Sequence, residues 1–227
     1  MTGQPDARSA ILARIRANTV PANGPDLREV QVNARLKAHP RGILPALPID
    51  DPVAMFRSKA EAASASVDVI TSRQAGAAIL KWLRDHNLPQ ALRMGKDARL
   101  HKIDWKRRNG PEILHGPSDG NDLVGLSHAL GGIAETGTLL LASGPDNPTS
   151  INFLPENHIV VLNAADIEAN HEPLWTKIRR KYGAGRMPRT INMITGPSRS
   201  ADIEQTLILG AHGPVRLHII ILKDSGL

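Results

Sequence analysis

The amino-acid sequence predicts an α/β domain in which helices cover both faces of a parallel sheet. From residue 51 onward, amphipathic segments of helical length alternate with short apolar runs, which is the order typical of a parallel α/β sheet. One run, His158–Leu162, is apolar at every position after the histidine, as expected for a strand buried on both faces. The chain has 227 residues, of which 41% are hydrophobic, and this suffices for one large core.

The first 48 residues are predicted to stand apart from this domain. An apolar stripe with arginines outside it predicts a helix over Asp6–Asn18. Closely spaced prolines in Thr19–Pro48 argue against long regular elements there. We therefore divide the chain into residues 1–48, a helix and a proline-rich arm, and residues 49–227, the α/β domain. The arm has two interpretations: a loop lying over the domain surface, or an extension that reaches a partner subunit.

The elements of the domain follow from capping residues and apolar runs. Asp51 followed by Pro52 is a strong helix start, and this helix is expected to reach about Ala63. Further helices are predicted at Ser72–Asn87 and Ala165–Tyr182, with a short helical turn at Ser200–Glu204. Predicted strands are Val67–Ile70, Ala91–Met94, Thr138–Ala142, His158–Leu162, Thr190–Thr195 and Val215–Leu222.

Composition excludes several classes of chemistry. The chain has no cysteine, so it holds no disulfide, no thiolate nucleophile and no cysteine-ligated metal or iron–sulfur cluster. The histidines show no metal-ligand spacing, so we expect no metal site. Neither G-x-G-x-x-G nor G-x-x-x-x-G-K-[ST] occurs, which argues against standard dinucleotide binding and P-loop chemistry. Apolar runs are short and the N-terminus lacks a signal peptide, so we expect a soluble, cytoplasmic protein without a membrane span.

The formal charge of +6 raises the question of an anionic partner. Basic residues gather in two stretches, Arg93–Arg108 and Arg179–Arg189. They could attract nucleic acid, but solvated surface charge is the favoured interpretation, because no row of aromatic side chains accompanies them as a stacking platform. Aromatic residues make up only 3% of the chain. Nucleic acid is therefore the weakest of the candidate partners.

Polar residues at a tight turn before the predicted strand Thr138–Ala142 form the first candidate motif. Glycines at 132 and 137 allow a bend and a close approach of ligand to backbone, and threonine hydroxyls lie beside them. Glu135 lies at the crest and is the candidate catalytic residue, as a base or an acyl acceptor, although a structural role is equally open. The ligand-binding candidates in this turn are Thr136, Gly137 and Thr138.

A second candidate motif follows the predicted strand Thr190–Thr195. Gly196-Pro197 turns the chain, and a helix start after it would offer free N–H groups to an anion. Arg199 could add a bidentate grip on a carboxylate or phosphate, or it could pair locally with Asp202. His212, in a later turn, could act as acid or base. The ligand-binding candidates here are Gly196, Ser198, Arg199, Ser200, Asp202, Glu204 and His212.

Four motifs in this order resemble the LUD-domain family, in particular its lactate utilization protein C type. The resemblance covers about Asp51 to the C-terminus, and Ser200 stands where the family pattern has threonine. An ordered run of motifs is more specific than any single motif. The four are Ile133–Leu139, Leu154-Pro155-x-x-His158 before a valine-rich strand, Gly196–Glu204, and Gly210-x-His212-Gly213-Pro214-x-x-Leu217-His218.

This resemblance implies a Rossmann-like three-layer α/β/α sandwich of the sugar-phosphate isomerase and CoA-transferase type. It also implies a role in oxidation of L-lactate to pyruvate, as one of three co-encoded proteins. In that system the iron–sulfur clusters belong to partner proteins, and a chain without cysteine agrees with a subunit that carries no cofactor.

Three functions are carried forward from the sequence. The first is an accessory subunit of an L-lactate-oxidising system, with a crevice for a small carboxylate or phosphate at the strand ends. The second is a stand-alone acyl- or CoA-transferase-like enzyme in which Glu135 forms an acyl intermediate. The third and weakest is a nucleic-acid-binding protein. The first two functions depend on the residues around Thr136 and Arg199, and the third depends on the basic stretches. The first also requires the turn at Thr136 and the turn at Arg199 to line one concavity.

Overall fold

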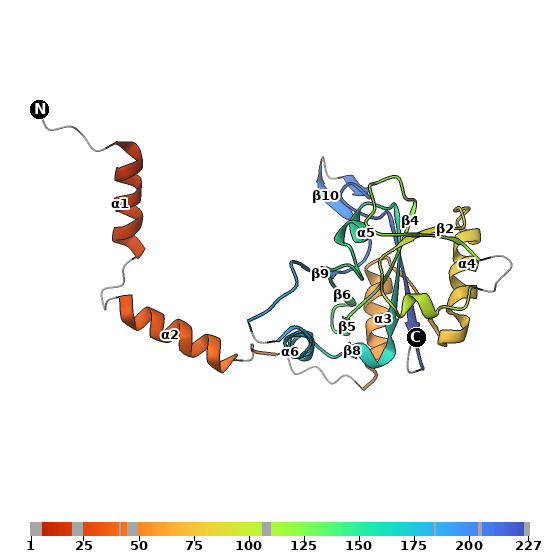
Figure 1. The fold of residues 1–227 in the computed structure, drawn as a ribbon, viewed down its shortest axis with the longest axis horizontal. Coiled ribbons are helices and arrows are strands. Elements are labelled where there is room, and N and C mark those ends of the chain that lie inside the picture. Colours follow the sequence, from red (N-terminus) through yellow and green to blue (C-terminus); the bar gives the residue numbers. More distant parts are fainter. Residues whose placement is uncertain are drawn as a thin grey trace, which may run out of the picture. The chain divides into compact units, whose positions relative to one another are not determined.

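The computed structural model describes residues 6–19, 25–40, 42–44, 50–105, 110–183, 185–203 and 206–224, with side chains of residues 201–209 left out. The chain divides into two units, residues 1–44 and residues 45–227 (Figure 1). The sequence placed this boundary after residue 48.

The N-terminal unit consists of two helices, α1 (Ala7–Thr19) and α2 (Pro25–Ala38). The predicted first helix is confirmed, and the Asp6 carboxylate caps it by accepting hydrogen bonds from the backbone of Arg8 and Ser9. The prediction that Thr19–Pro48 holds no long regular element is wrong, because α2 has 14 residues. Pro25 is its first residue, where proline's missing N–H costs nothing, so prolines bracket this helix and do not interrupt it.

A six-stranded sheet forms the centre of the second unit, in the order β1-β12-β7-β4-β2-β3. All five strand pairs are parallel, which confirms the predicted parallel sheet. The strands are β1 (Ser66–Ile70), β2 (Ala91–Met94), β3 (Glu112–His115), β4 (Val124–His128), β7 (Asn157–Asn163) and β12 (Arg216–Leu222). Of these, β3 and β4 were not predicted.

A second, four-stranded sheet in the order β8-β5-β6-β9 was also not predicted. Its hairpin joins β5 (Gly131–Ile133) to β6 (Thr138–Ala142), and β6 pairs antiparallel with β9 (Ile191–Ile194). The two-residue strand β8 (Ile167–Glu168) completes it. Short strands with glycine, such as β5, carry little periodic signal, because their pairing with neighbouring strands decides their conformation.

The two faces of the central sheet are covered differently. Alternate residues of β7 and β12 point to opposite faces, as strand geometry requires. Val160 and Ile219 pack with α3 (Pro52–Ala62) and with β6, whereas Ile159 and Ile220 pack with α4 (Ala75–Asp85). The outer face of the second sheet is in turn covered by α6 (His171–Tyr182). The three-layer α/β architecture is thus confirmed, with the second sheet sharing a layer with α3 (Figure 1).

Two predicted helices differ from the structure. The helix predicted from Ala165 begins only at His171, where the Asn170 side chain caps it by accepting from the backbone N–H of Glu172. The residues before it form η3 (Ala164–Asp166) and β8. The helical turn predicted at Ser200–Glu204 is instead a strand, β10 (Arg199–Ile203), paired antiparallel with β11 (Thr206–Leu209). A cross-strand partner outweighed the local turn signal, so no helix N-terminus exists at this position.

The remaining elements are short. They are η1 (Ser72–Gln74), η2 (Leu100–Lys102) and α5 (Thr149–Phe153). In the part of the chain that the structure describes, none of the helices combines the length and apolar character needed to cross a bilayer.

The predicted N-cap of α3 can be tested directly. The Asp51 side chain accepts hydrogen bonds from the backbone N–H groups of Val53 and Ala54, both at 3.0 Å. We expect Asp51→Ala to lower the free energy of unfolding by about 1 kcal/mol, the typical cost of losing such a cap. Urea unfolding measures this difference. The neighbouring exposed Asp50, changed to alanine, serves as the control, and an equal loss in both variants would contradict the capping role.

Candidate functional site

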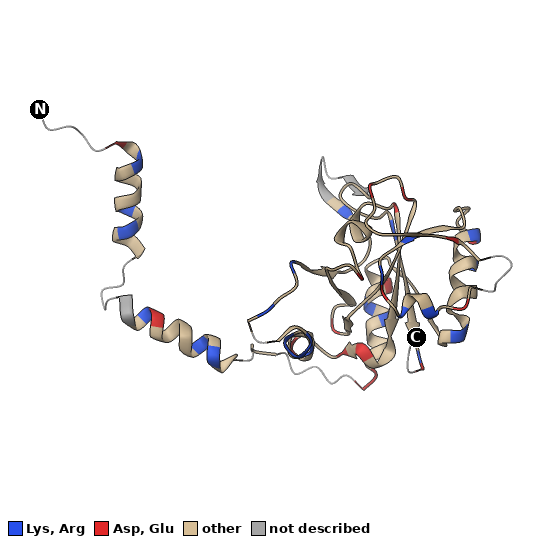
Figure 2. Ribbon diagram, viewed as in Figure 1, with Lys and Arg blue, Asp and Glu red and all other residues tan. Residues whose placement is uncertain are grey.

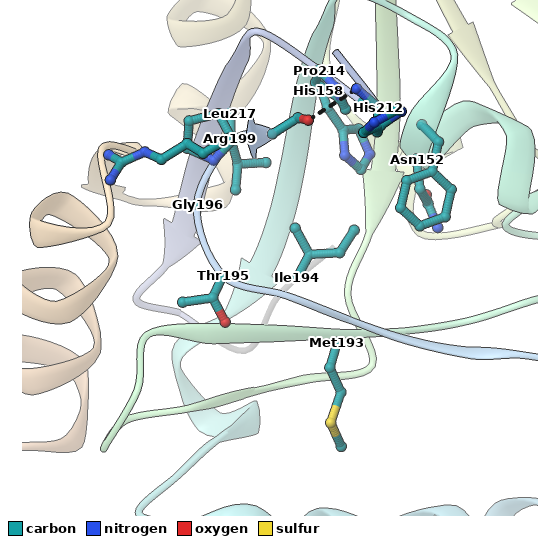
Figure 3. Close-up of a pocket in the computed structure, with 14 residues that line it drawn as sticks. Asn152, His158, Met193, Ile194, Thr195, Gly196, Arg199, His212, Pro214 and Leu217 are labelled. Atoms are coloured by element: carbon teal, nitrogen blue, oxygen red, sulfur yellow. Dashed lines mark hydrogen bonds between the residues drawn. The ribbon is translucent and has the colours of Figure 1, made fainter. Parts of the chain in front are cut away.

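A pocket of about 270 Å³ opens where the turn after β9 meets the turn before β12 (Figure 3). It lies at the amino ends of β7 and β12, because His158 and Leu217, which line it, are the second residues of those strands. Its polar lining includes Asn152, His158, Thr195, Ser198, Arg199 and His212, and its apolar walls come from Phe153, Met193, Ile194, Pro197, Pro214 and Leu217.

Backbone hydrogen bonds hold the two turns against each other. The N–H of Ser198 donates to the Pro214 carbonyl at 2.9 Å, and the N–H of Gly210 donates to the Ser198 carbonyl at 3.0 Å. The Ser198 hydroxyl oxygen accepts from the backbone N–H of His212 at 3.3 Å (Figure 3). Thus Gly196, Ser198 and His212, which the sequence singled out in separate motifs, line one concavity.

A buried hydrogen-bond relay lies at the inner end of this pocket. Asn152 on α5 and His158 on β7 are each 0% exposed. The Ser127 hydroxyl on β4 joins them, because it donates to Asn152 Oδ1 at 3.2 Å and contacts His158 Nε2 at 3.0 Å. The other polar atoms of the pair, Asn152 Nδ2 and His158 Nδ1, are buried without a protein partner. Since buried polar groups are costly to leave unpaired, these two atoms call for a ligand or water.

The relay has two possible hydrogen-bond arrangements, and each leaves one unpaired donor and one unpaired acceptor. Burial lowers the pKa of His158 to about 3, so the ring is neutral at pH 7 and carries a single N–H. When Ser127 donates to Asn152, His158 Nε2–H donates to Ser127, which leaves Nδ1 as an acceptor and Asn152 Nδ2 as a donor. Turning the amide over reverses every bond and exchanges the two roles. Either arrangement leaves one donor and one acceptor at the two ends of the relay, and a hydroxyl group, which both donates and accepts, can pair with either end.

Arg199 lies at the rim, and its side chain leads away from the relay. Its guanidinium donates to the Ser64 hydroxyl beyond the end of α3. Figure 3 shows the side chain extending in that direction, while His158 and Asn152 lie at the other end of the pocket. Ser200 follows Arg199 in β10 but does not line the pocket. The backbone of Asp202 also belongs to β10, and the predicted site residue Glu204 lies outside the described residues.

The residues of the first motif lie beside the pocket, not in its lining. Thr138 forms a hydroxyl chain with Thr136 at 2.7 Å and with Thr195, a pocket residue, at 2.6 Å. Gly137 lies against the backbone of α3. The Glu135 side chain faces the start of α6, with Oε1 3.8 Å from His171 Nδ1, and it is 15% exposed. The expectation that both motifs line one concavity is therefore wrong: the first motif touches the pocket only through the Thr138–Thr195 hydrogen bond, and Glu135 faces a different neighbour.

Among the described residues, the basic side chains are spread over several elements. Figure 2 shows lysine and arginine on several separate elements. Within the first basic stretch, Arg93 pairs with Asp122 and Arg99 pairs with Asp97. Among the described residues, no three His, Asp or Glu side chains gather closely enough to hold a metal ion.

Sequence reasoning overlooked the relay itself. From the sequence, His158 is only the first residue of a predicted buried strand, and neither Ser127, on a strand that was not predicted, nor Asn152 is a candidate. The only available signal was a histidine at the start of an otherwise apolar strand.

The buried histidines predict a loss of stability in mild acid. Burial lowers the pKa of His158 to about 3 and that of His218 to about 4. In the unfolded chain both histidines titrate near 6.5. Below that pH the unfolded state therefore binds more protons than the folded state does. The free energy of unfolding should therefore fall as pH drops from 6.5 toward 4, by up to about 1.4 kcal/mol per pH unit for each histidine. Urea unfolding at pH 7, 6 and 5 measures this slope.

Two variants separate this effect from general acid sensitivity. His218→Gln should reduce the slope, because it removes one of the buried rings whose pKa is lowered. His101→Gln, at an exposed histidine, should leave it unchanged. Equal slopes in wild type and His218→Gln would exclude this origin of the pH dependence.

Comparison with known proteins supports the motif-based expectation. The LUD domain family model matches residues 53–222. The chain belongs to the LUD domain family. A solved structure of a DUF162 family protein from Deinococcus radiodurans matches this LUD domain with a TM-score of 0.55 at 19% identity, over 78% of this chain and 99% of that one. At that identity the match supports the fold alone.

Several curated relatives of this LUD domain protein carry names from lactate metabolism. Lactate utilization protein C of Halalkalibacterium halodurans is 26% identical over 74% of this chain and 72% of its own. Lactate utilization protein C of Bacillus subtilis is 34% identical over 53% of this chain and 50% of its own. YkgG of Escherichia coli, named as uncharacterized, is 38% identical over 54% of this chain and 52% of its own. For the last two, the chain thus spans about half of the relative's length.

Proposed function

We propose that this protein is an accessory, ligand-binding component of a lactate-utilisation system, and that its pocket binds a small 2-hydroxycarboxylate such as L-lactate. The names of its relatives support the metabolic setting. The observation that carries the ligand's chemistry is the pair of unpartnered atoms on Asn152 and His158, of which one is a donor and the other an acceptor.

The pocket suits a small molecule with one polar and one apolar end. The hydroxyl of a 2-hydroxy acid would pair with Asn152 and His158, and its short alkyl part would contact the apolar walls. The carboxylate would lie toward the mouth, where the Ser198 hydroxyl and the exposed side chains of Arg199 and His212 lie. A carboxylate there needs Arg199 to turn from Ser64, which its exposure permits.

In this proposal the chain binds substrate or product, and the electron transfer of lactate oxidation occurs elsewhere. The chain has no cysteine with which to hold an iron–sulfur cluster. The clusters would belong to partner proteins of the same system. The purified chain alone should therefore show no oxidation of L-lactate.

Calorimetric titration of the full chain tests the ligand assignment. We expect saturable binding of L-lactate at millimolar concentration, and at least tenfold weaker binding of propionate, which has the same carboxylate and carbon count but no hydroxyl. Tenfold corresponds to about 1.4 kcal/mol, within the cost of leaving a buried polar pair unmatched. Equal affinity for L-lactate and propionate would contradict the assignment.

A genetic experiment tests the metabolic setting independently. Deleting the gene in its own organism should prevent growth on L-lactate and leave growth on pyruvate intact. Affinity capture of the tagged chain from lactate-grown cells should recover iron–sulfur proteins. Normal growth of the deletion strain on L-lactate would reject the proposed role.

A further inference from the structure

A second cavity, of about 200 Å³, lies at the opposite end of the central sheet's strands from the first pocket. Its walls come from the segment after β2, the end of β4, the loop after β6 and the last turn of α6. His128, the last residue of β4, and Asp97, three residues after β2, place it at the carboxyl ends of these two neighbouring strands. None of the predicted site residues lines this cavity.

The strand order reverses at this position. The chain passes from β2 to its outer neighbour β3, but from β4 it reaches its next partner in this sheet, β7, on the other side. In open parallel sheets the two connections then diverge and leave a crevice at the carboxyl ends, which is where such folds generally bind ligands. The topology of the sheet therefore predicts a ligand site at the carboxyl ends of β2 and β4.

The cavity wall is tightly held. The N–H of Lys96 donates to the Pro145 carbonyl at 3.0 Å, so the loop after β6 is bonded to the segment after β2. The loop also presses on Gly95, where a Cβ atom would lie 2.1 Å from the Asp146 carbonyl oxygen. Only a residue without a side chain permits this approach. The cavity is consequently part of the packed structure and not a gap between loose segments.

Two buried side chains present acceptors that no protein group satisfies. His128, 3% exposed, contacts the Ala129 carbonyl through Nδ1 at 2.8 Å. A carbonyl only accepts, so Nδ1 carries the hydrogen of the neutral ring and Nε2 offers a lone pair. Asn147, 5% exposed, donates through Nδ2 to the Ala142 carbonyl at 3.3 Å, which leaves Oδ1 as an acceptor. Both His128 Nε2 and Asn147 Oδ1 lack a partner.

The charges around these acceptors nearly balance. Asp97 and Arg99 form a two-bond ion pair, with contacts of 2.9 and 2.6 Å. Asp146 and Lys181 add one negative and one positive group, and the other ionisable groups in the lining are the neutral ring of His128 and the phenol of Tyr182. The lining therefore mixes acceptors with donors and has no strong net charge.

We propose that this cavity is a second ligand site, and that it binds a small polyhydroxylated molecule, a monosaccharide or a polyol. Each hydroxyl can donate to His128 Nε2, Asn147 Oδ1 or Asp146, and can at the same time accept from Lys181 or Tyr182. The volume is several times the roughly 30 Å³ share of one water molecule, so it admits a molecule of this size.

Other ligand classes match the lining less well. A carboxylate only accepts, so it would leave His128 Nε2 and Asn147 Oδ1 unsatisfied. A free phosphate keeps a hydroxyl that can donate, but its negative charge would meet the carboxylates of Asp97 and Asp146. An ammonium ion would satisfy the acceptors but would meet Arg99 and Lys181. Hydroxyl groups, which carry no charge and both donate and accept, complement the donors and the acceptors of the lining.

Saturation-transfer NMR on the full chain tests this site with D-ribose, D-glucose and myo-inositol as probes. We expect saturable binding of at least one of the three, and at least tenfold weaker binding to His128→Asn. Asparagine can keep the donation to the Ala129 carbonyl through its amide nitrogen, but it lacks the Nε2 acceptor. Lys181→Met, at an accessible residue, should also weaken binding, at least threefold.

His115→Asn, the same substitution at an exposed histidine, is the matched control and should bind the probe as wild type does. Binding should persist in excess L-lactate, because lactate is proposed to occupy the other pocket. The proposal is overturned if none of the three probes binds the folded chain, if His128→Asn and Lys181→Met bind as tightly as wild type, or if L-lactate displaces the probe.

Discussion

Gly137→Ala should lower the free energy of unfolding by about 3 kcal/mol, the largest single-residue loss of stability expected here. Gly137 has a φ of +68°, so an alanine would be strained in place. Its Cβ would also lie 2.4 Å from the backbone nitrogen of Ala60 on α3. The hairpin between β5 and β6 would have to move away from that helix. For a domain of this size, the melting temperature should fall by roughly 6–12 °C.

The control for this variant isolates the close contact from the backbone strain. Gly185 has a φ of +70°, but a Cβ there would meet nothing within 4 Å. Gly185→Ala should therefore cost only the left-handed strain, about 1 kcal/mol. Thermal unfolding of both variants gives the comparison. Similar melting temperatures would show that α3 does not constrain Gly137, and that the hairpin glycine has another role.

His158→Gln should weaken L-lactate binding tenfold or more, which is the largest functional effect we expect from a conservative change. The glutamine amide can occupy the place of Nε2 and keep the contact with Ser127, but nothing replaces Nδ1. The ligand hydroxyl would then lose one of its two partners, at a cost of about 1–3 kcal/mol. Calorimetric titration measures the affinity, and circular dichroism checks that the variant is folded.

A second buried histidine provides the comparison for His158→Gln. His218 contacts the Ser66 hydroxyl through Nδ1 at 2.8 Å and stacks on Trp82, and it does not line the pocket. His218→Gln should therefore bind L-lactate as wild type does. Equal weakening in both variants would indicate a general loss of packing and would remove the evidence for a specific His158 contact.

The sheet was predictable where burial leaves a uniform apolar run. The predicted strand His158–Leu162 falls within β7, and the predicted strand Val215–Leu222 begins one residue before β12 and ends with it; both strands lie at the centre of the packing. By contrast, β4 contains Gly125, Ser127 and His128, so its sequence gives no sign that every residue of the strand is buried. Its neighbours on both sides decide its conformation.

The candidate site was predictable only in part. Ser198, Arg199 and His212 were singled out from turns with polar residues, and the structure places all three along one pocket. Glu135 was singled out by the same reasoning, but its side chain faces His171 and does not line that pocket. A tight turn with polar residues indicates exposure and hydrogen bonding, but the direction of a side chain depends on what the turn packs against.

Local patterns in this chain were sufficient for the class of fold, the order of about half of the elements and the membership of the LUD domain family. They could not indicate that Ser127 bridges Asn152 and His158, or that His128 and Asn147 share a second cavity. These groups come from segments of the chain that meet only when the strands align side by side. Partners and cavities of this kind are properties of packing between distant segments, and only the folded structure reveals them.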